Sequence, residues 1–287
     1  MKFETPQTIE AATALLAADA GARVLAGGTD LLVRLRAGQI EPSAVIDIKR
    51  IKGMSDITQE DGGWRIGAAV PCSVMGEHDG LKAAYPGVVE GAELIGSTQV
   101  QGRCTMVGNL CNAGPAGDSV PAMVAAGASV RIAGPEGTRD VPVIDIPLSP
   151  GKTSLAKGEF VTSVFLPARP ARSSDAYLRF IPRTEMDIAV VGCAVNLSLN
   201  EDGTVKEAHV SLGAVAPKVL DVPEAAAALI GSKCEDAALE ALATAATAAA
   251  TPIDDKRGTV AFRKDVSGVL ARRAAKLAYT RAMGEKS

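Results

Sequence analysis

Hydrophobic positions in the first half of the chain follow two different spacings. The range 9–16 places apolar residues on one face of a helix, whereas 44–48 is a short apolar run typical of a buried strand. By the same criteria we expect strands at 23–26, 64–70, 129–133 and 160–166, and helices at 31–37, 73–78, 88–95 and 119–126. Short strands and helices mixed in this way predict an α+β architecture.

The second half of the chain separates the two spacings. Strand-like segments at 176–182, 188–199 and 205–214 come first, and alanine-rich helical segments follow at 223–230, 235–249 and 260–283. A sheet followed by helices predicts a compact two-layer domain. Between the halves, the prolines and small polar residues of 167–174 suit a linker. We therefore expect two domains, 1–170 and 171–287.

The stretch 103–118 fits neither spacing. Its three glycines and one proline interrupt any regular period, which predicts a shaped loop. Between these breakers lie short polar side chains that form hydrogen bonds at close range and fill a core poorly. These candidate ligand groups are Thr105, Asn109, Asn112 and Asp118.

A second polar stretch, 26–31, reads Ala-Gly-Gly-Thr-Asp-Leu and follows the strand expected at 23–26. Thr29 or Asp30 can cap the next helix. A strand, two glycines and a helix start direct free backbone N–H groups and the positive end of a helix dipole at one point, which suits a pyrophosphate. Two adjacent glycines are also common in ordinary turns. Together, the two stretches predict two walls around one large polar ligand.

Other nucleotide motifs are absent. No Gly-x-Gly spacing occurs in the chain, which disfavours a Rossmann dinucleotide domain. The segment 150–153 is similar to the end of a P-loop, but Ile146 stands where that motif needs its first glycine. With only two histidines, both distant in sequence from the two polar stretches, a Ser-His-Asp hydrolase also has little support.

Composition limits the other partners. The chain has 287 residues, of which 47% are hydrophobic, and a net charge of -3. This balance gives no broad attraction to nucleic acid or to anionic lipid. No apolar run approaches the roughly 20 residues of a membrane span, and the N-terminus lacks the apolar core of a secretion signal. We therefore expect a cytoplasmic protein.

The cysteines and the last helix leave alternatives open. Five cysteines, no two closer than seven positions, form neither a disulfide framework nor a metal site, so no metal is expected in this chain. Cys104 and Cys111 fall in the polar stretch 103–118, where ligand contact and simple burial are both open. The six basic residues of 260–283 form either a solvated face or a dock for an acidic partner; we prefer the solvated face.

Three ordered motifs carry a resemblance to a known family. They are 26–31, 105–118 and Arg-Thr-Glu-Met-Asp-Ile-Ala at 183–189. Over essentially its full length the chain resembles the FAD-binding medium subunit of molybdenum hydroxylases. That group includes aerobic carbon monoxide dehydrogenase, xanthine dehydrogenase and bacterial N-heterocycle hydroxylases.

The resemblance implies a fold and a cofactor. The fold is a vanillyl-alcohol-oxidase (PCMH)-type FAD-binding domain of two α+β subdomains, followed by a smaller α+β domain with a three-stranded sheet and helices. FAD is expected to be non-covalent, because no histidine lies near the first motif. The implied cofactor-binding positions are Ala26, Gly27, Gly28, Thr29, Asp30, Leu31, Thr105, Gly108, Asn109, Asn112, Asp118, Leu148 and Arg183.

The implied roles divide by motif. The first motif holds the pyrophosphate, and the second holds the diphosphate, the ribityl chain and the ring edge. Phosphate repels a carboxylate, so an aspartate there should accept from sugar hydroxyls or a ring N–H. Leu148 and Arg183 are implied beside the isoalloxazine, where a cation stabilises reduced flavin. Which of Tyr177 and Phe180 stacks on the flavin, if either does, stays open.

The resemblance also implies partners. The chain is expected to be one of three subunits, beside a large subunit with molybdopterin and a small subunit with two [2Fe-2S] clusters, and the complex is expected to be a dimer of heterotrimers. Electrons would pass through the clusters to FAD and then to oxygen, NAD or a quinone, and no residue here would serve as a catalytic acid or base. The alternatives are a stand-alone FAD-dependent reductase of the same fold and a non-catalytic assembly partner.

Overall fold

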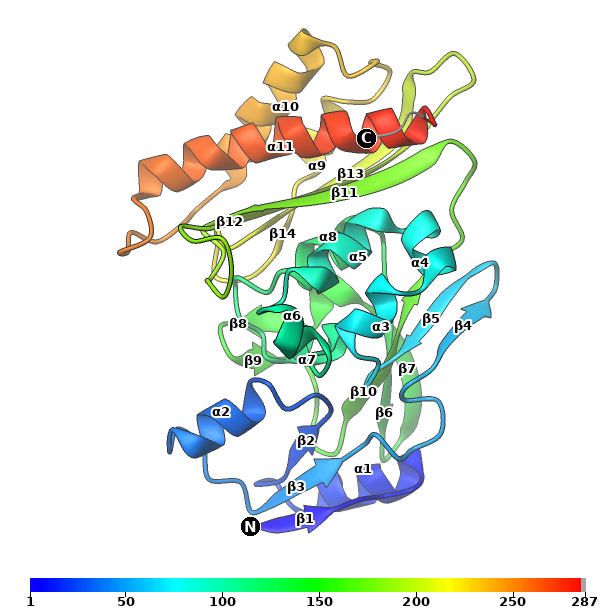
Figure 1. Ribbon diagram of the computed structural model, residues 1–287, viewed down its shortest axis with the longest axis vertical. Helices are drawn as coiled ribbons and strands as arrows, with labels where there is room; N and C mark the ends of the chain where they lie inside the picture. Colours follow the sequence, from blue (N-terminus) through cyan, green and yellow to red (C-terminus); the bar gives the residue numbers. More distant parts are fainter. Residues whose placement is uncertain (285–287) are drawn as a thin grey trace.

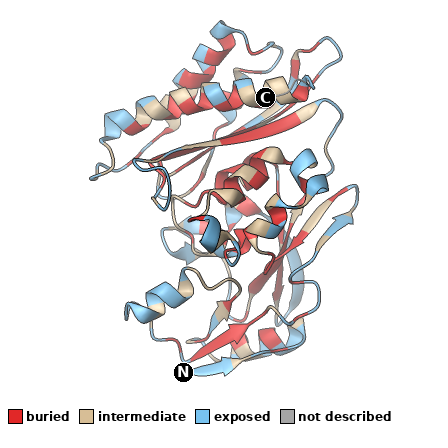
Figure 2. Cartoon of the chain, viewed as in Figure 1, coloured by how far each residue is buried: buried red, intermediate tan, exposed pale blue. Residues whose placement is uncertain are grey.

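The computed structural model describes residues 1–284 and stacks three α+β layers along its long axis (Figure 1). The N-terminus lies at one end, and the C-terminal helix crosses the other end. Buried residues gather in the strands and on the helix faces that cover them (Figure 2). Among the described residues, no helix is both long and apolar enough to cross a membrane.

The first layer is a small parallel sheet with strand order β1-β3-β2. Its elements are β1 (Lys2–Glu4), α1 (Ile9–Ala18), β2 (Arg23–Leu25), α2 (Leu31–Arg36) and β3 (Ala44–Asp47). Thr8 caps α1 by accepting a hydrogen bond from the backbone N–H of Ala11 at 3.1 Å. The expected strand, glycine pair and helix at 23–37 are confirmed, and they place the glycine pair between β2 and α2.

The second layer is a five-stranded antiparallel sheet with order β4-β5-β10-β6-β7. Its strands are β4 (Ile57–Glu60), β5 (Gly63–Gly67), β6 (Ser129–Gly134), β7 (Gly137–Pro142) and β10 (Phe160–Leu166). A separate hairpin pairs β8 (Pro147–Ser149) with β9 (Lys152–Thr153), after the short turn η1 (Val143–Asp145). The helices are α3 (Cys72–Gly76), α4 (Asp79–Ala84), α5 (Pro86–Glu93), α6 (Thr98–Gln101), α7 (Met106–Cys111) and α8 (Ser119–Ala125).

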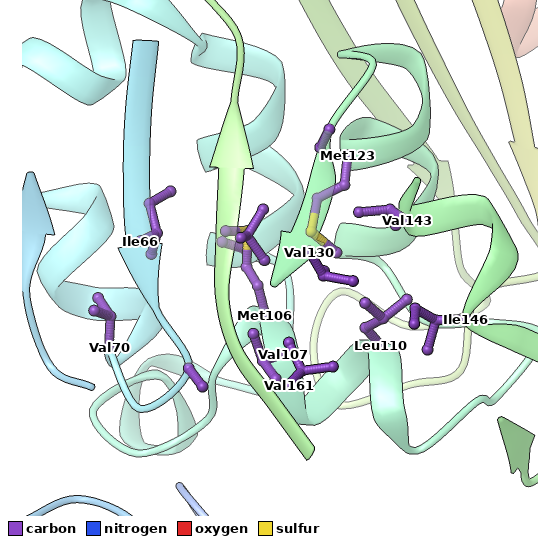
Figure 3. Close-up of a cluster of buried hydrophobic side chains, with 14 of the residues drawn as sticks. Ile66, Val70, Met106, Val107, Leu110, Met123, Val130, Val143, Ile146 and Val161 are labelled. Carbon is purple, nitrogen blue, oxygen red and sulfur yellow. The ribbon is translucent and has the colours of Figure 1, made fainter. Parts of the chain in front are cut away.

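The prediction that 103–118 is only a loop was wrong, because α7 lies inside it. Thr105 caps this helix, and its side chain accepts a hydrogen bond from the N–H of Gly108 at 2.9 Å. Met106, Val107 and Leu110 point into the core (Figure 3). The spacing of these three apolar residues is that of a helix, but the surrounding glycines concealed this pattern in the sequence.

The third layer is an antiparallel sheet of order β11-β12-β13-β14 covered by helices. Its elements are β11 (Ser173–Phe180), β12 (Val191–Leu199), β13 (Val205–Gly213), β14 (Leu220–Asp221), α9 (Pro223–Ala227), α10 (Asp236–Ala249) and α11 (Val260–Ala282). The three expected strands are joined by a fourth, β14, too short to show a period. Five of the six alanines of α11 are buried, which lets this helix lie close to β11 and β12.

The basic residues of α11 do not form one solvated face. Arg263 is only 3% exposed; it donates to the carbonyl of Val190 at 2.8 Å and pairs with Asp255 at 2.6 Å. Arg281, near the other end, pairs with Glu90 of α5 at 2.5 Å. The preferred prediction was therefore wrong for these two arginines, because each anchors α11 to another element.

A polar seam joins the third layer to the helices below it. It consists of Glu90, Asp118, Arg169, Asp175, Tyr177, Arg179 and Arg281. Asp175 is 2% exposed and accepts from Arg169 at 2.9 Å and from the N–H of Val88 at 3.1 Å. Glu90 accepts from the N–H of Tyr177 at 2.9 Å. These contacts fix the orientation of β11 on α5.

Candidate functional site

A cavity of about 630 Å³ opens where the two polar stretches meet. This volume lies within the range of roughly 300–1,000 Å³ typical of small-molecule and cofactor sites. Ten of the thirteen predicted cofactor-binding residues line it: Ala26, Gly27, Gly28, Thr29, Asp30, Leu31, Thr105, Gly108, Asn109 and Asn112. The structure therefore brings both motifs to one cavity, although about 80 residues separate them in sequence.

Gly27 makes the contact between the two walls. A Cβ atom at this position would lie 1.9 Å from the carbonyl oxygen of Arg103 and 3.1 Å from the Cα of Cys104. Both neighbours are backbone atoms, so no side-chain rotation relieves the overlap. Only glycine permits the loop after β2 to lie against the segment that leads into α7. Gly28, next to it, has φ +78°, which also favours glycine.

The first wall presents backbone donors without acceptors. Within residues 1–284, the N–H groups of Gly27, Gly28, Thr29 and Asp30 donate to no other group of the chain. These N–H groups precede α2, whose N-terminus adds a positive partial charge. Neighbouring unsatisfied donors at a cavity wall attract an anion with several oxygens.

The charged side chains of the cavity favour the same ligand. Arg34 and Lys157 line it, and in the described part of the chain neither side chain forms a hydrogen bond or an ion pair. The acids are engaged, because Asp19 accepts from Ser43 at 2.7 Å and Glu159 pairs with Arg139 at 2.8 Å. The cations thus remain available to a ligand, whereas these two carboxylates do not.

Asp30 is the exception among the acids. Although this residue reaches solvent, partial desolvation of its carboxylate raises its pKa, and the charge of Arg34 opposes that rise. A carboxylate beside phosphate is unfavourable, so Asp30 is better suited to accept from a hydroxyl.

The second wall offers side-chain amides. The side-chain oxygen of Asn109 accepts from the Oγ of Ser119 at 2.9 Å and from its N–H at 3.3 Å. Its amide NH₂ donates to no other group in the described part of the chain and can therefore donate to a ligand. Asn112, at the end of α7, lines the cavity with a side chain that has no partner among the described residues. The hydroxyl oxygen of Thr105 caps α7, so this residue contributes to the shape of the cavity wall.

These residues fit a dinucleotide with a diphosphate. The amides and cations without partners in the described part of the chain suit phosphate oxygens, and Gly27 and Gly28 line the cavity without side chains. Apolar side chains, including Leu16, Ile48 and Phe160, line other parts of the cavity and suit a ring system.

Three predicted cofactor-binding residues do not line the cavity. Asp118 lies in the seam, where its oxygens accept from Arg179 at 2.7 Å and from the Tyr177 hydroxyl at 3.1 Å. Burial raises the pKa of Asp118 to about 6, against the opposing charge of Arg179. Leu148 is 57% exposed on β8. Arg183 is exposed and pairs with Asp187 at 3.1 Å.

The two candidate aromatic residues differ in position. Tyr177 is 2% exposed and engaged with Asp118, so its ring belongs to the seam. Phe180 is 38% exposed and packs edge to face on Phe262 at a centroid distance of 5.6 Å. Of the two, only Phe180 presents a surface to a ligand or a partner.

Sequence reasoning missed part of the wall. Gly151 and Thr153 line the cavity together with Lys157. The segment 150–153 was interpreted only as an incomplete P-loop. Its glycine, lysine and threonine at 151–153 were nevertheless a signal of a ligand site. Cys104 and Cys111, for which ligand contact was left open, both line the cavity.

Fold and cavity together define a dinucleotide-binding protein with a second α+β domain. Residues 1–169 match the family described as the FAD binding domain in molybdopterin dehydrogenase, and residues 176–278 match the CO dehydrogenase flavoprotein C-terminal domain. The chain therefore belongs to the family of molybdopterin dehydrogenase FAD-binding proteins, as the sequence motifs indicated.

Relatives cover nearly the whole chain. The carbon monoxide dehydrogenase medium chain of Hydrogenophaga pseudoflava is 30% identical over 98% of this chain and 97% of its own. The xanthine dehydrogenase FAD-binding subunit of Escherichia coli O157:H7 is 28% identical over 91% and 90%. A solved Cu,Mo-CO dehydrogenase chain superimposes with a TM-score of 0.93 at 30% identity, covering 98% of each chain. The predicted fold is thereby confirmed.

Proposed function

We propose that this chain is the FAD-binding electron-transfer subunit of a heterotrimeric molybdenum hydroxylase, an oxidoreductase. The observation that carries the proposal is the cavity in which four consecutive backbone N–H groups and two cationic side chains have no partner among residues 1–284. Family membership and relatives named as medium chains or FAD-binding subunits support it. When bound, FAD supplies the redox chemistry, taking up electrons and passing them on.

The chain's own residues bind and orient this cofactor. Gly27, Gly28 and Thr29 offer backbone donors to the diphosphate, and Arg34 and Lys157 balance its charge. Asn109 and Asn112 donate from the second wall, and Ala26 and Leu31 shape the first. This division explains why ten predicted positions converge on one cavity.

The remaining predicted positions have weaker support. Leu148 and Arg183 stay proposed neighbours of the isoalloxazine, since both have exposed side chains. Asp118 has both carboxylate oxygens engaged, so we propose that it acts on the cavity only by holding the seam. We also propose domains 1–170 and 171–287, supported by the two largely separate clusters of buried residues.

Two partner subunits complete the proposal. A large subunit would carry molybdopterin and a small subunit the two [2Fe-2S] clusters, in a cytoplasmic dimer of heterotrimers. The final electron acceptor would be oxygen, NAD or a quinone. Because substrate is oxidised on another polypeptide, this chain needs no catalytic acid or base.

Affinity purification of the full chain from its host tests the proposal. We expect yellow protein with visible flavin absorbance, in complex with one molybdenum-containing and one iron-containing subunit. A colourless chain that cannot be reconstituted with FAD would refute the flavin role. A yellow chain that reduces an acceptor without partners would instead support the stand-alone reductase.

A further inference from the structure

Two cysteines from distant parts of the chain lie side by side at the cavity wall. The backbone N–H of Cys72, the first residue of α3, donates to the carbonyl oxygen of Cys104 at 2.9 Å. Both residues are buried, with exposed fractions of 0% and 3%. Each thiol acts on the pKa of the other, so the two side chains lie close together. Neither the motifs nor the proposed electron transfer gives this pair a role.

The spacing suits a disulfide. Standard backbone bond lengths and the 2.9 Å hydrogen bond between them limit the separation of the two Cα atoms to about 7 Å at most. A disulfide spans Cα separations of roughly 4.4–6.8 Å. Because the two side chains also lie close together, the S–S bond can form without a large backbone movement.

The two thiols differ in access and in chemistry. Cys104 lines the cavity and Cys72 does not. The neighbouring Cys72 thiol lowers the pKa of Cys104, whereas the Cys104 thiol and burial raise the pKa of Cys72. Burial raises the pKa of Cys111, Cys193 and Cys234 to about 12. Cys104 is thus the cysteine that best combines thiolate character with access to a small oxidant.

We propose that Cys104 and Cys72 form an oxidation site, at which a hydroperoxide converts the thiol pair into a disulfide. The Cys104 thiolate attacks one peroxide oxygen; the S–O bond forms, the O–O bond breaks, and with hydrogen peroxide the leaving hydroxide takes up a proton to become water. Cys72 then attacks the sulfenic acid sulfur, and a second water leaves as the S–S bond forms. The thiols lose two electrons and the peroxide gains them.

The position of the bond gives it a structural consequence. Cys104 follows Arg103, whose carbonyl oxygen lies against Gly27, and precedes Thr105, which caps α7. A disulfide would tether both contacts to the start of α3 and thereby fix the second wall of the cavity. The inference rests on the thiol geometry and stands whether or not the proposed function is correct.

Peptide mapping tests the site. The purified full chain is treated with hydrogen peroxide, its remaining thiols are blocked, and non-reducing digests are analysed by mass spectrometry. We expect two of the five free thiols to be lost and a Cys72–Cys104 crosslinked peptide to appear, which a reductant reverses. Peroxide-treated protein that retains five thiols, or pairs Cys104 with another cysteine, would overturn the proposal.

Matched variants identify the reacting thiol. Cys193→Ala alters a cysteine buried in β12, far along the chain from the pair, and should leave the crosslink unchanged. Cys104→Ala should slow thiol loss at least tenfold, and Cys72→Ala should stop oxidation at the sulfenic acid, detectable with dimedone. Equal dimedone labelling of Cys72→Ala and Cys104→Ala would contradict the assignment. The wild-type mapping remains decisive if a variant fails to fold.

Discussion

The cavity wall and the seam are both polar, but they differ in hydrogen bonding. The polar groups of the seam are paired with one another, whereas several at the cavity wall have no partner within residues 1–284. In the seam, Asp175 accepts from Arg169 and from the N–H of Val88, and Glu90 accepts from Tyr177 and Arg281. At the cavity, by contrast, consecutive N–H groups and two cations have no partner within residues 1–284.

This difference distinguishes polar groups that stabilise the fold from polar groups that bind a ligand. A buried charge without a partner costs several kcal/mol, so polar groups that serve the fold are satisfied within it. Groups left unsatisfied at a cavity are available to a ligand that completes them. On this basis, changes in the seam should reduce stability, and changes at the cavity should reduce FAD affinity.

Arg169→Met should have the largest effect, and it should act on stability. The change leaves Asp175, 2% exposed, without its charged partner, which typically costs about 3–5 kcal/mol. Urea unfolding measures this loss. The control Arg272→Met breaks an exposed pair with Glu240 and should cost less than about 1 kcal/mol. Equal losses in both variants would show that the seam is not a stabilising network.

Gly27→Ala should separate the two walls. Its Cβ would meet the Arg103 carbonyl oxygen at 1.9 Å, and overpacking against backbone costs about 3 kcal/mol. We expect at least a tenfold loss of FAD affinity in fluorescence titration. In Gly102→Ala the nearest atom lies at 3.9 Å, so this variant should bind FAD normally. Wild-type affinity in Gly27→Ala would exclude the convergence of the walls as the binding determinant.

Asp118 should give the seam a pH dependence. Its folded pKa is raised from 3.8 to about 6, so the folded state holds the proton more tightly than the unfolded state. The associated stability is present below about pH 4 and is lost as pH rises to about 6, on the order of 3 kcal/mol in all. Asp118→Asn should reduce the dependence of the free energy of unfolding on pH, measured by unfolding curves recorded between pH 4 and 6.5. An unchanged slope would assign the titration to another group.

Arg34→Gln and Lys157→Gln should have the smallest effects. Each removes one cation of the cavity, and exposed charges contribute about 1 kcal/mol or less to an ionic contact. We expect FAD affinity to fall about twofold to fivefold, more at low salt than at high salt. Arg36 lies on the same helix but does not line the cavity, so Arg36→Gln serves as the control. Identical affinities in all three variants would argue against a charge contribution.

Local patterns in the sequence were sufficient for most of the fold. The strand, glycine pair and helix of the first wall and the long elements of the third layer follow from periodicity and breakers. The same reasoning missed α7, because glycines in 103–118 concealed an apolar helical spacing. It also missed β14, which at two residues carries no period.

The site was harder to predict where it depends on long-range contacts. Asp118 is separated from Tyr177 by 59 positions, and only the packing of α8 on β11 reveals that the seam engages it. In the same way, Lys157 shows no local feature that marks it as a cavity cation. Short polar residues indicate that a loop either binds a ligand or caps a helix. Only the contacts made in the folded chain determine which of the two roles each residue has.

The central claim is that unsatisfied donors of the cavity bind the diphosphate of FAD. The most direct test is a calorimetric titration of the flavin-free full chain with FAD and, separately, with riboflavin, which shares the ring and ribityl chain but has no phosphate. We predict that FAD binds one to one and at least a hundredfold more tightly than riboflavin. Added salt should reduce the difference between the two affinities. Equal affinities for the two flavins would contradict it.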